Sequence, residues 1–198
     1  MFAVVESGSI TSMPRGNKGI QIGDIKHSAD IFTAKWTEAQ RNAIGVYTVE
    51  IDDTNKKDEA WYINTNITYA FSGGKVKGTY GTATARAIAD ANAKDENGDD
   101  LDPVVVIKGL KTIKKELIDS QCAGTLAPSD WRVIKEQETG SAMDSGWKTW
   151  RGNVRTKCNS MQTQITNAAN VDALAALFTY TTTDGVTSRP LGEFPVKE

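Results

Sequence analysis

The chain has one histidine, His27, and this residue is the first candidate for acid–base or metal chemistry. A zinc-type site needs several His or Cys ligands close together, and none lies near His27 in the sequence. Nucleophilic catalysis needs a base that a third group orients, and the flanking Asp24 and Asp30 offer proximity along the chain and nothing more. We therefore expect a surface or hydrogen-bonded histidine with no catalytic or metal-binding role.

Carboxylates are the second candidate, because a pair of them can hydrolyse a glycosidic bond without any histidine. They gather in two runs, 52–59 and 95–102, which are typical of turns and are not interleaved with the aromatic residues of a sugar cleft. The chain also lacks the phosphate-binding patterns GxxxxGK[ST] and GxGxxG. These observations predict a protein that is not an enzyme, with no catalytic residue and no cofactor.

A calcium loop is suggested by the alternation of Asp95, Asn97 and Asp99. The pattern then fails at two positions, because Asp100 stands where glycine is required and Val106 where a bidentate glutamate is required. A solvated acidic loop is the better interpretation, and no metal site is predicted.

The bulk properties exclude two classes of partner. The 198 residues carry a formal net charge of -2, whereas general nucleic-acid binding draws its affinity from an excess of Lys and Arg. No stretch approaches the roughly 20 apolar residues that span a bilayer. The first residues, MFAVVESGSI, lack the basic segment of a signal peptide. We expect no nucleic-acid partner and no membrane partner.

The N-terminal part is predicted to be β-rich. The segments 2–5 and 9–13 read as a hairpin, and strands are expected at 46–51, 61–64, 67–71 and 76–80. Thr37-Glu-Ala-Gln40 matches a capping box, which predicts a short helix that stops before Gly45. Residues 1–86 should form a small antiparallel sheet with one short helix, and the acidic segment 87–103 should be a linker or loop.

The C-terminal part, 104–180, is predicted to be helical because the apolar period changes to about 3.6. A helix over 107–123 should bury one apolar face, and a short helix after Ser129 should turn Trp131 and Ile134 inward and end at Gly140. The longest helix should begin at 144 or 145 and run to about 169, and a last short helix should reach 178. Residues 181–198 should form an extended tail or a disordered end. The fold class is α+β. The predicted apolar face of the first helix comprises Leu110, Ile113, Leu117, Ile118 and Cys122.

The longest helix carries a narrow seam, the most informative pattern in the chain. Four of its residues follow one another at intervals of seven, and three more lie four residues after the first three. Two interpretations stay open: the seam packs on the 107–123 helix with Trp131 between them, or it joins a partner chain. Arg151 within the seam favours internal packing. The seam is Trp147, Arg151, Val154, Cys158, Met161, Ile165 and Ala168. The packing or partner interface that we predict consists of Trp131, Trp147, Trp150, Val154, Cys158, Met161 and Ile165.

The two cysteines, Cys122 and Cys158, lie 36 residues apart on apolar faces of predicted helices. Their number allows a disulfide, but buried free thiols are the expectation, because a free cysteine behaves as a small hydrophobic residue.

Two segments resemble tailed-phage proteins. The stretch LAPSDWRVIKEQETGSAMDSGWKTWRGNVRT combines Asp130-Trp131, Glu138-Thr-Gly140 and a Trp-Arg-x-x-Val-Arg segment, and NVDAL follows at 170–174. The upstream stretch FTAKWTEAQRNAIGVYTVEID resembles a second module of such proteins, with Trp36 before Gly45-Val-Tyr. Together they cover most of residues 31–178.

This resemblance implies a structural component of a virion tail, tail fibre or baseplate, and transfers no catalytic residue. The implied partners are other phage virion proteins, with a homo-oligomer or several copies in the particle, and the implied location is the virion tail, with the host cytoplasm during assembly. A tail-fibre assembly chaperone or adaptor is the alternative. A glycan-active fibre protein or a receptor-binding one is a weaker alternative. Receptor binding would use strand aromatics if they are exposed, namely Trp61, Tyr62, Tyr69 and Tyr80.

Overall fold

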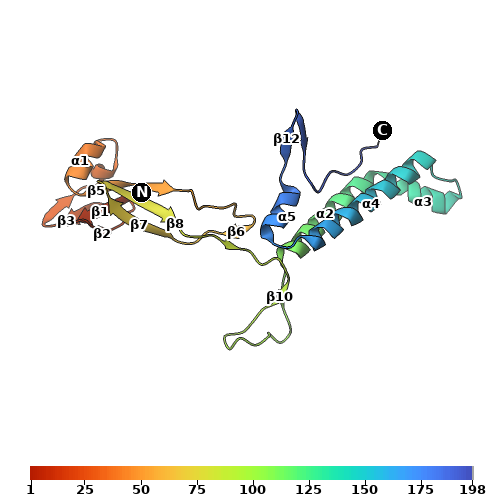
Figure 1. Ribbon diagram of the computed structural model, residues 1–198, viewed down its shortest axis with the longest axis horizontal. Helices are drawn as coiled ribbons and strands as arrows, with labels where there is room; N and C mark the ends of the chain where they lie inside the picture. Colours follow the sequence, from red (N-terminus) through yellow and green to blue (C-terminus); the bar gives the residue numbers. More distant parts are fainter. Residues whose placement is uncertain (198) are drawn as a thin grey trace. The chain divides into compact units, whose positions relative to one another are not determined.

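In the computed structural model, which describes residues 1–197, the chain divides into an N-terminal unit, Met1–Thr84, and a C-terminal unit, Ala85–Glu198. The first unit is built mainly of strands and the second mainly of helices (Figure 1), which confirms the predicted α+β class. The acidic segment 87–103, predicted as a linker or loop, belongs to the C-terminal unit.

The N-terminal unit is a sheet with short helices beside it. Five of its strands form one sheet in the order β2-β1-β5-β8-β7. Its elements are β1 (Phe2–Glu6), β2 (Ser9–Ser12), β3 (Ile20–Ile22), β4 (Ile25–His27), the 3-10 helix η1 (Ala29–Phe32), α1 (Glu38–Ala43), β5 (Val46–Asp52), β6 (Tyr62–Ile63), β7 (Ile67–Ser72), β8 (Lys75–Tyr80) and β9 (Thr84–Ala85), the last of which spans the unit boundary.

One pairing in this sheet corrects the prediction of a wholly antiparallel module. β5 and β8 run parallel, with Val49 opposite Val76, whereas β1–β2, β1–β5 and β7–β8 are antiparallel. Apolar alternation reports which side chains face the core and carries no information on strand direction. Direction follows from the connection, and here residues 53–74 return the chain to the end from which β5 began.

Both faces of the sheet are covered, which explains the unbroken apolar run at the start of the chain. Ala3 and Val5 pack with Val49 and Val76 on one face. Val4, between them, packs on the other face with Ile31 and Val46, beneath η1 and α1. Because successive side chains of a strand point to opposite faces, a strand buried on both sides needs apolar residues at every position.

The short helix α1 begins as predicted. Thr37 Oγ1 accepts a hydrogen bond from Gln40 N at 3.3 Å, and Gln40 Oε1 accepts one from Thr37 N at 2.8 Å. Gly45 follows the helix with φ +80°, and its carbonyl accepts from Val5 N at 2.8 Å. A Cβ at Gly45 would stand 2.6 Å from Val5 O, so glycine is required here both for its conformation and for this close approach.

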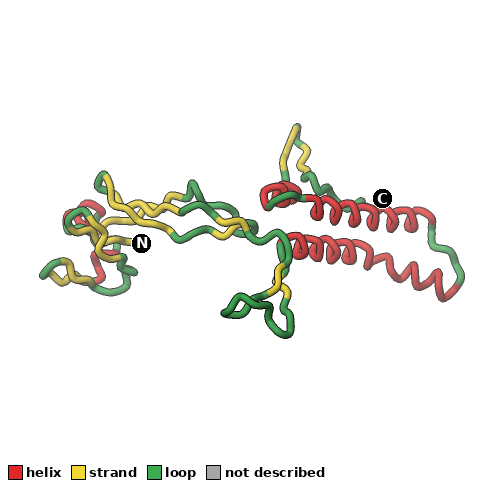
Figure 2. Tube along the Cα trace, turned by 60° about the horizontal axis from the view of Figure 1, so that its bottom comes forward, coloured by secondary structure: helices red, strands yellow, loops and turns green. Residues whose placement is uncertain are grey.

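The C-terminal unit is an antiparallel helical hairpin with two small β-hairpins. Lys111 Nζ donates to Thr166 O at 2.8 Å at one end of the pair α2–α4, and Arg151 donates to Leu126 O at 3.0 Å at the other (Figure 2). Its elements are β10 (Ala91–Asn92), β11 (Val106–Ile107), α2 (Leu110–Leu126), the 3-10 helix η2 (Ala127–Ser129), α3 (Asp130–Thr139), α4 (Ser145–Asn167), α5 (Val171–Phe178), β12 (Thr181–Thr183) and β13 (Val186–Ser188).

The start of α2 lies three residues later than predicted because the chain before it is fixed by Asp90. The Asp90 carboxylate accepts from Gly109 N at 2.7 Å and from Thr112 Oγ1 at 3.0 Å, and so caps the first turn from outside the helix. Of the predicted apolar face, Leu110, Ile118 and Cys122 are buried. The prediction was wrong for Ile113 and Leu117, which are 45% and 42% exposed because α4 covers only one narrow side of α2.

Both segments outside the helices form hairpins. β10, in the acidic segment, pairs with β11 just after that segment, and β12 pairs with β13 in what was predicted as an extended tail or a disordered end. The second hairpin turns at Asp184-Gly185, where both residues have positive φ. After it the chain returns to the helices: Leu191 is fully buried and its N–H donates to Leu177 O at 3.1 Å.

Candidate functional site at the closed end of the helical hairpin

The predicted seam of α4 lies against α2 along most of its length. Val154, Met161 and Ile165 are fully buried, and Cys158 and Ala168 nearly so. Ile118 and Leu126 of α2, the helix on which α4 packs, are buried as well. The structure therefore places this part of the predicted interface inside the unit, where it serves the fold and is not available to a partner.

Arg151 is the polar member of the seam and is also buried. Its Nη1 donates to Leu126 O at 3.0 Å and to Ser129 Oγ, and its Nη2 donates to Asp130 Oδ1 at 2.6 Å. The guanidinium thus joins the last residue of α2, η2 and the first residue of α3. A buried guanidinium needs several acceptors to offset its lost hydration, and this corner supplies three. The sequence pattern marked Arg151 but did not identify Ser129 and Asp130 as its partners.

The aromatic residues at this end lie differently from the prediction. Trp131 is 52% exposed and Ile134 56% exposed, so neither turns inward between α2 and α4 as predicted. The short α3 lies beside the first turns of α4 (Figure 2), where Arg132 meets Trp147 and Glu136 pairs with Lys148, and Trp131 and Ile134 stay largely uncovered. Trp147 and Trp150 are half-buried and meet edge to face at 5.5 Å between ring centroids.

Trp147 and Trp131 hold an arginine between them. The Arg132 guanidinium carbon lies 4.5 Å from the Trp131 ring centroid and 4.3 Å from the Trp147 ring centroid. Arg132 Nε is buried with no hydrogen-bond partner among residues 1–197. Cation–π contacts on both sides therefore fix this guanidinium where hydrogen bonds do not.

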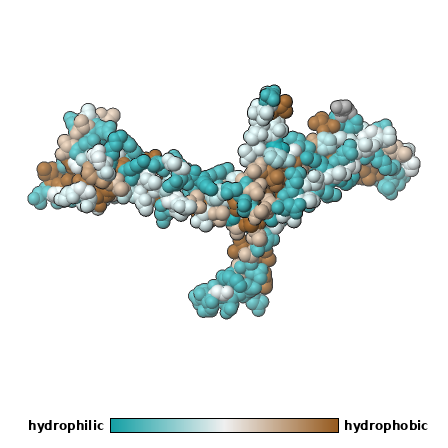
Figure 3. Space-filling model, viewed as in Figure 1, coloured by the Kyte–Doolittle hydropathy of each residue, from teal (hydrophilic) through white to brown (hydrophobic). Residues whose placement is uncertain are grey.

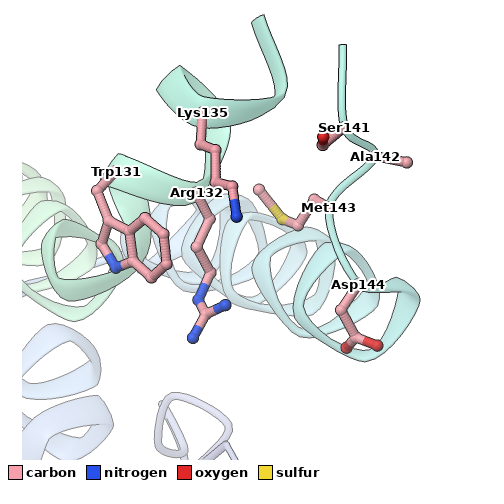
Figure 4. Close-up of a pocket in the computed structure, with 7 residues that line it drawn as sticks. All are labelled: Trp131, Arg132, Lys135, Ser141, Ala142, Met143 and Asp144. Carbon is pink, nitrogen blue, oxygen red and sulfur yellow. The ribbon is translucent and has the colours of Figure 1, made fainter. Parts of the chain in front are cut away.

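A small pocket opens beside this stack (Figure 4). The labelled side chains of Arg132 and Lys135 descend from α3, and Met143 and Asp144 face them from the segment that leads into α4. Its volume of about 80 Å³ suits a single side chain of a protein and is small for a substrate. The complete lining is Trp131, Arg132, Lys135, Ser141, Ala142, Met143 and Asp144.

The C-terminal residues cross the other side of this end. Trp150 Nε1 donates to Pro195 O at 2.8 Å, and Lys197 Nζ lies 5.4 Å from the Trp147 ring centroid. Asp144, which also lines the pocket, accepts from Gly146 N at 3.0 Å and Trp147 N at 3.3 Å and so caps α4. Several polar groups here thus have structural partners, and the pocket lining adds one aromatic side chain, Trp131, and two cationic ones, Arg132 and Lys135.

The acidic segment uses its carboxylates for its own turn. Asp95 Oδ1 accepts from Asn97 N at 2.8 Å and from Asp99 N at 2.9 Å, and these backbone hydrogen bonds lower the pKa of Asp95. Within residues 1–197, no three His, Cys, Asp or Glu side chains are arranged to hold a metal ion. None of the helices in this described part has the length and hydrophobicity for crossing a membrane.

The four aromatics named for receptor binding differ in exposure. Trp61 and Tyr62 are buried, and Tyr69 and Tyr80 are half-buried. His27, at the end of β4, is also half-buried, and its ring meets Trp36 edge to face at 6.1 Å. Trp61 and Tyr62 therefore serve the core of the N-terminal unit, whereas Tyr69 and Tyr80 keep part of their surface accessible.

Local sequence signals set the helix ends at the closed end of the helical hairpin. Gly140 (φ +68°) ends α3, and Asp144 caps the start of α4. Together they assemble a buried arginine, an aromatic–arginine stack and a small cationic pocket. Comparison of the chain with protein-family models, with curated proteins and with solved structures finds no match.

Proposed function

We propose that the chain is a non-enzymatic structural component of a tailed-phage virion, in the tail, fibre or baseplate, and that it acts through protein–protein contacts. Support for the phage assignment is the resemblance of residues 31–178 to tailed-phage proteins. Support for the contact role is one observation: four consecutive aliphatic residues, Val104–Ile107, are each 50–59% exposed. Scattered apolar residues are normal on a protein surface, but a continuous row of them marks an interaction site.

The row belongs to the stem of the β10–β11 hairpin. Figure 3 shows hydrophobic residues along this stem and hydrophilic ones toward its tip. A two-stranded hairpin is marginally stable in water unless something packs on it. The β10–β11 sheet has two strands, and among residues 1–197 no third strand covers it.

The outer edge of β11 is open for backbone pairing. Asn92 lies opposite Val106, and Ala93 N donates to Val105 O at 2.7 Å, so the backbone groups of Val105 face β10. Backbone groups alternate in direction along a strand, which turns those of Val104 and Val106 to the other edge. An edge with apolar side chains and free backbone groups pairs readily with another strand.

A second copy of this chain is the occupant that we propose for this edge. The hydrogen-bond pattern of an antiparallel pair is symmetric about a twofold axis, so one edge can pair with itself. The row is flanked by Asp102 on one side and Lys108 on the other. In an antiparallel pair the acidic end of one copy meets the basic end of the other. Lys108 already contacts Glu116 at 2.5 Å, but both side chains are half-exposed and such surface pairs exchange at little cost.

Size-exclusion chromatography with light scattering tests the self-association. The wild-type chain should run as an oligomer, and Val106→Lys should weaken association at least tenfold, because it places a charge in the apolar row. Val186→Lys is the matched control: Val186 is 68% exposed in the other small hairpin, β12–β13, and its change should leave the oligomer intact. A wild-type monomer at high concentration, or equal effects of the two variants, contradicts the proposal.

Mass spectrometry of purified phage particles tests the virion assignment. We expect the chain in several copies per particle, beside other virion proteins, after assembly in the host cytoplasm. Its presence in infected cells but absence from particles would instead identify an assembly chaperone or adaptor.

A further inference from the structure

The two cysteines of the chain, far apart in sequence, occupy one level of the α2–α4 interface. Cys122 on α2 and Cys158 on α4 are both buried, and both thiols are free. Cys158 Sγ lies 3.7 Å from Asp119 Oδ1, one helical turn before Cys122. Cys122 is also among the neighbouring groups that raise the pKa of Cys158. Cys158 therefore packs against the α2 turn that runs from Asp119 to Cys122.

The neighbourhood holds this turn of α2 against α4. Gln162, one turn after Cys158, donates from Nε2 to Asp119 Oδ1 and lies 3.8 Å from Cys158 Sγ. The pair of helices is joined at both ends by the hydrogen bonds of Lys111 and Arg151, so sliding along the axis is restricted. Two thiols on facing helices at one level are the arrangement from which an interhelical disulfide can close with small side-chain rotations.

We propose that Cys122 and Cys158 form a dithiol modification site, which a small-molecule disulfide converts into an interhelical disulfide that fastens α2 to α4. In the first exchange one cysteine sulfur attacks a sulfur of the reagent and releases one reagent thiol. In the second, the other cysteine attacks the mixed disulfide and releases the second reagent thiol. Two protein thiols become one disulfide, the reagent disulfide becomes two thiols, and the protons pass from the cysteines to the released thiolates.

The site should stay reduced under mild conditions and close slowly. Burial raises the pKa of Cys158 to about 12, with further contributions from the neighbouring Cys122 and Asp119. Because the thiolate is the nucleophile, the rate of closure should rise about tenfold per pH unit well below this pKa. Asp119→Asn removes one of the causes and should accelerate closure.

The bond would constrain a long loop. It would join residues 36 positions apart, with η2, α3 and the first part of α4 between them. A cross-link of this length restricts the unfolded chain and should raise the thermal midpoint of the C-terminal unit by roughly 10 °C. The inference concerns this unit alone and does not depend on the phage assignment.

The experiment uses the folded full-length chain. One sample is incubated with glutathione disulfide at pH 8.5, and a second is kept in dithiothreitol. We expect the oxidised sample to lose two hydrogen atoms in its intact mass without a glutathione adduct. Peptide mapping without reduction should link the peptide of Cys122 to that of Cys158, and thermal unfolding should show the higher midpoint.

Two single variants and a second route to the bond make the test decisive. Cys122→Ala and Cys158→Ala each keep one thiol, which should remain free or carry one glutathione. For each variant, the thermal midpoint of the oxidised sample should not rise above that of its own reduced sample. A third sample of the wild-type chain is oxidised in urea and then refolded, so that slow access of the reagent to the buried thiols cannot hide the result. A disulfide between two chains overturns the proposal, and so does an oxidised, refolded chain whose midpoint is equal to or below that of the reduced chain.

Discussion

Arg151 and Asp130 are joined by a hydrogen bond of 2.6 Å from Nη2 to Oδ1, which ties the second turn of α4 to the first residue of α3. The arginine side chain is 6% exposed and the aspartate 54% exposed, so the charge is buried at one end of the pair and solvated at the other. This relationship explains how a charged residue can occupy a position of the apolar seam. The guanidinium reaches the end of the helical hairpin, where it binds a carboxylate that is in contact with solvent.

Replacing Arg151 by Met should destabilise the C-terminal unit by about 2–3 kcal/mol, because Leu126 O and Ser129 Oγ lose a donor in a buried place. Urea unfolding followed by circular dichroism measures the change. Arg155→Met, at an exposed position of the same helix, should change stability by less than about 0.5 kcal/mol. Equal effects of the two variants would show that the corner contacts contribute nothing.

Trp150→Phe should release the C-terminal segment while the helices stay folded. Phenylalanine keeps the aromatic packing but lacks the N–H that donates to Pro195 O, a hydrogen bond worth about 1 kcal/mol. Hydrogen exchange of residues 190–197 should become roughly fivefold faster. Trp131→Phe is the comparison, since Trp131 is exposed and should leave this exchange unchanged. Slow exchange in both variants would contradict the role of the indole.

Two glycines of the helical unit should respond to alanine in opposite directions. At Gly109 a Cβ would stand 2.3 Å from the backbone of Ala89, so Gly109→Ala should cost about 1–3 kcal/mol through overpacking. At Gly152, inside α4, a Cβ meets nothing within 4 Å, so Gly152→Ala should stabilise by roughly 0.5–1 kcal/mol through helix propensity. Chemical unfolding of both variants checks the signs, and a destabilised Gly152→Ala variant would show that this face of α4 is covered.

Stability should depend on pH through Asp90. Its pKa is lowered, first by the hydrogen bond from Gly109 N and then by that from Thr112. A depressed pKa in the folded state gives stability that is present above the unfolded pKa of about 3.9 and is lost as pH falls through the folded value. The stability difference between wild type and Asp90→Asn should therefore shrink between pH 5 and pH 2. A difference that stays constant over this range would exclude a titrating cap.

Local patterns determined the helices and most strands of this protein. The capping box at Thr37, the cap at Asp144 and the stop at Gly140 each act within a few residues, so the sequence alone locates these helix ends. The heptad spacing of the α4 seam likewise identifies a buried face, because the helix period converts spacing directly into a direction. The spacing also places Arg151 within this face, but it does not predict which groups accept hydrogen bonds from the guanidinium.

Tertiary structure decided which surfaces are covered. The helical period assigns Ile113, Leu117 and Ile118 to the same apolar face of α2. Only Ile118 of these three is buried, because the one neighbouring helix, α4, covers one narrow side of α2. Trp131 is exposed although α3 packs beside α4 through Arg132 and Asp130, and β5 runs parallel to β8 because of the path of the chain between them. The partners of Arg151 and the contact of Cys158 with Asp119 also join residues more than 20 positions apart. The sequence determines the direction in which a side chain points from its own helix or strand, and only the packing of distant segments decides what it meets there.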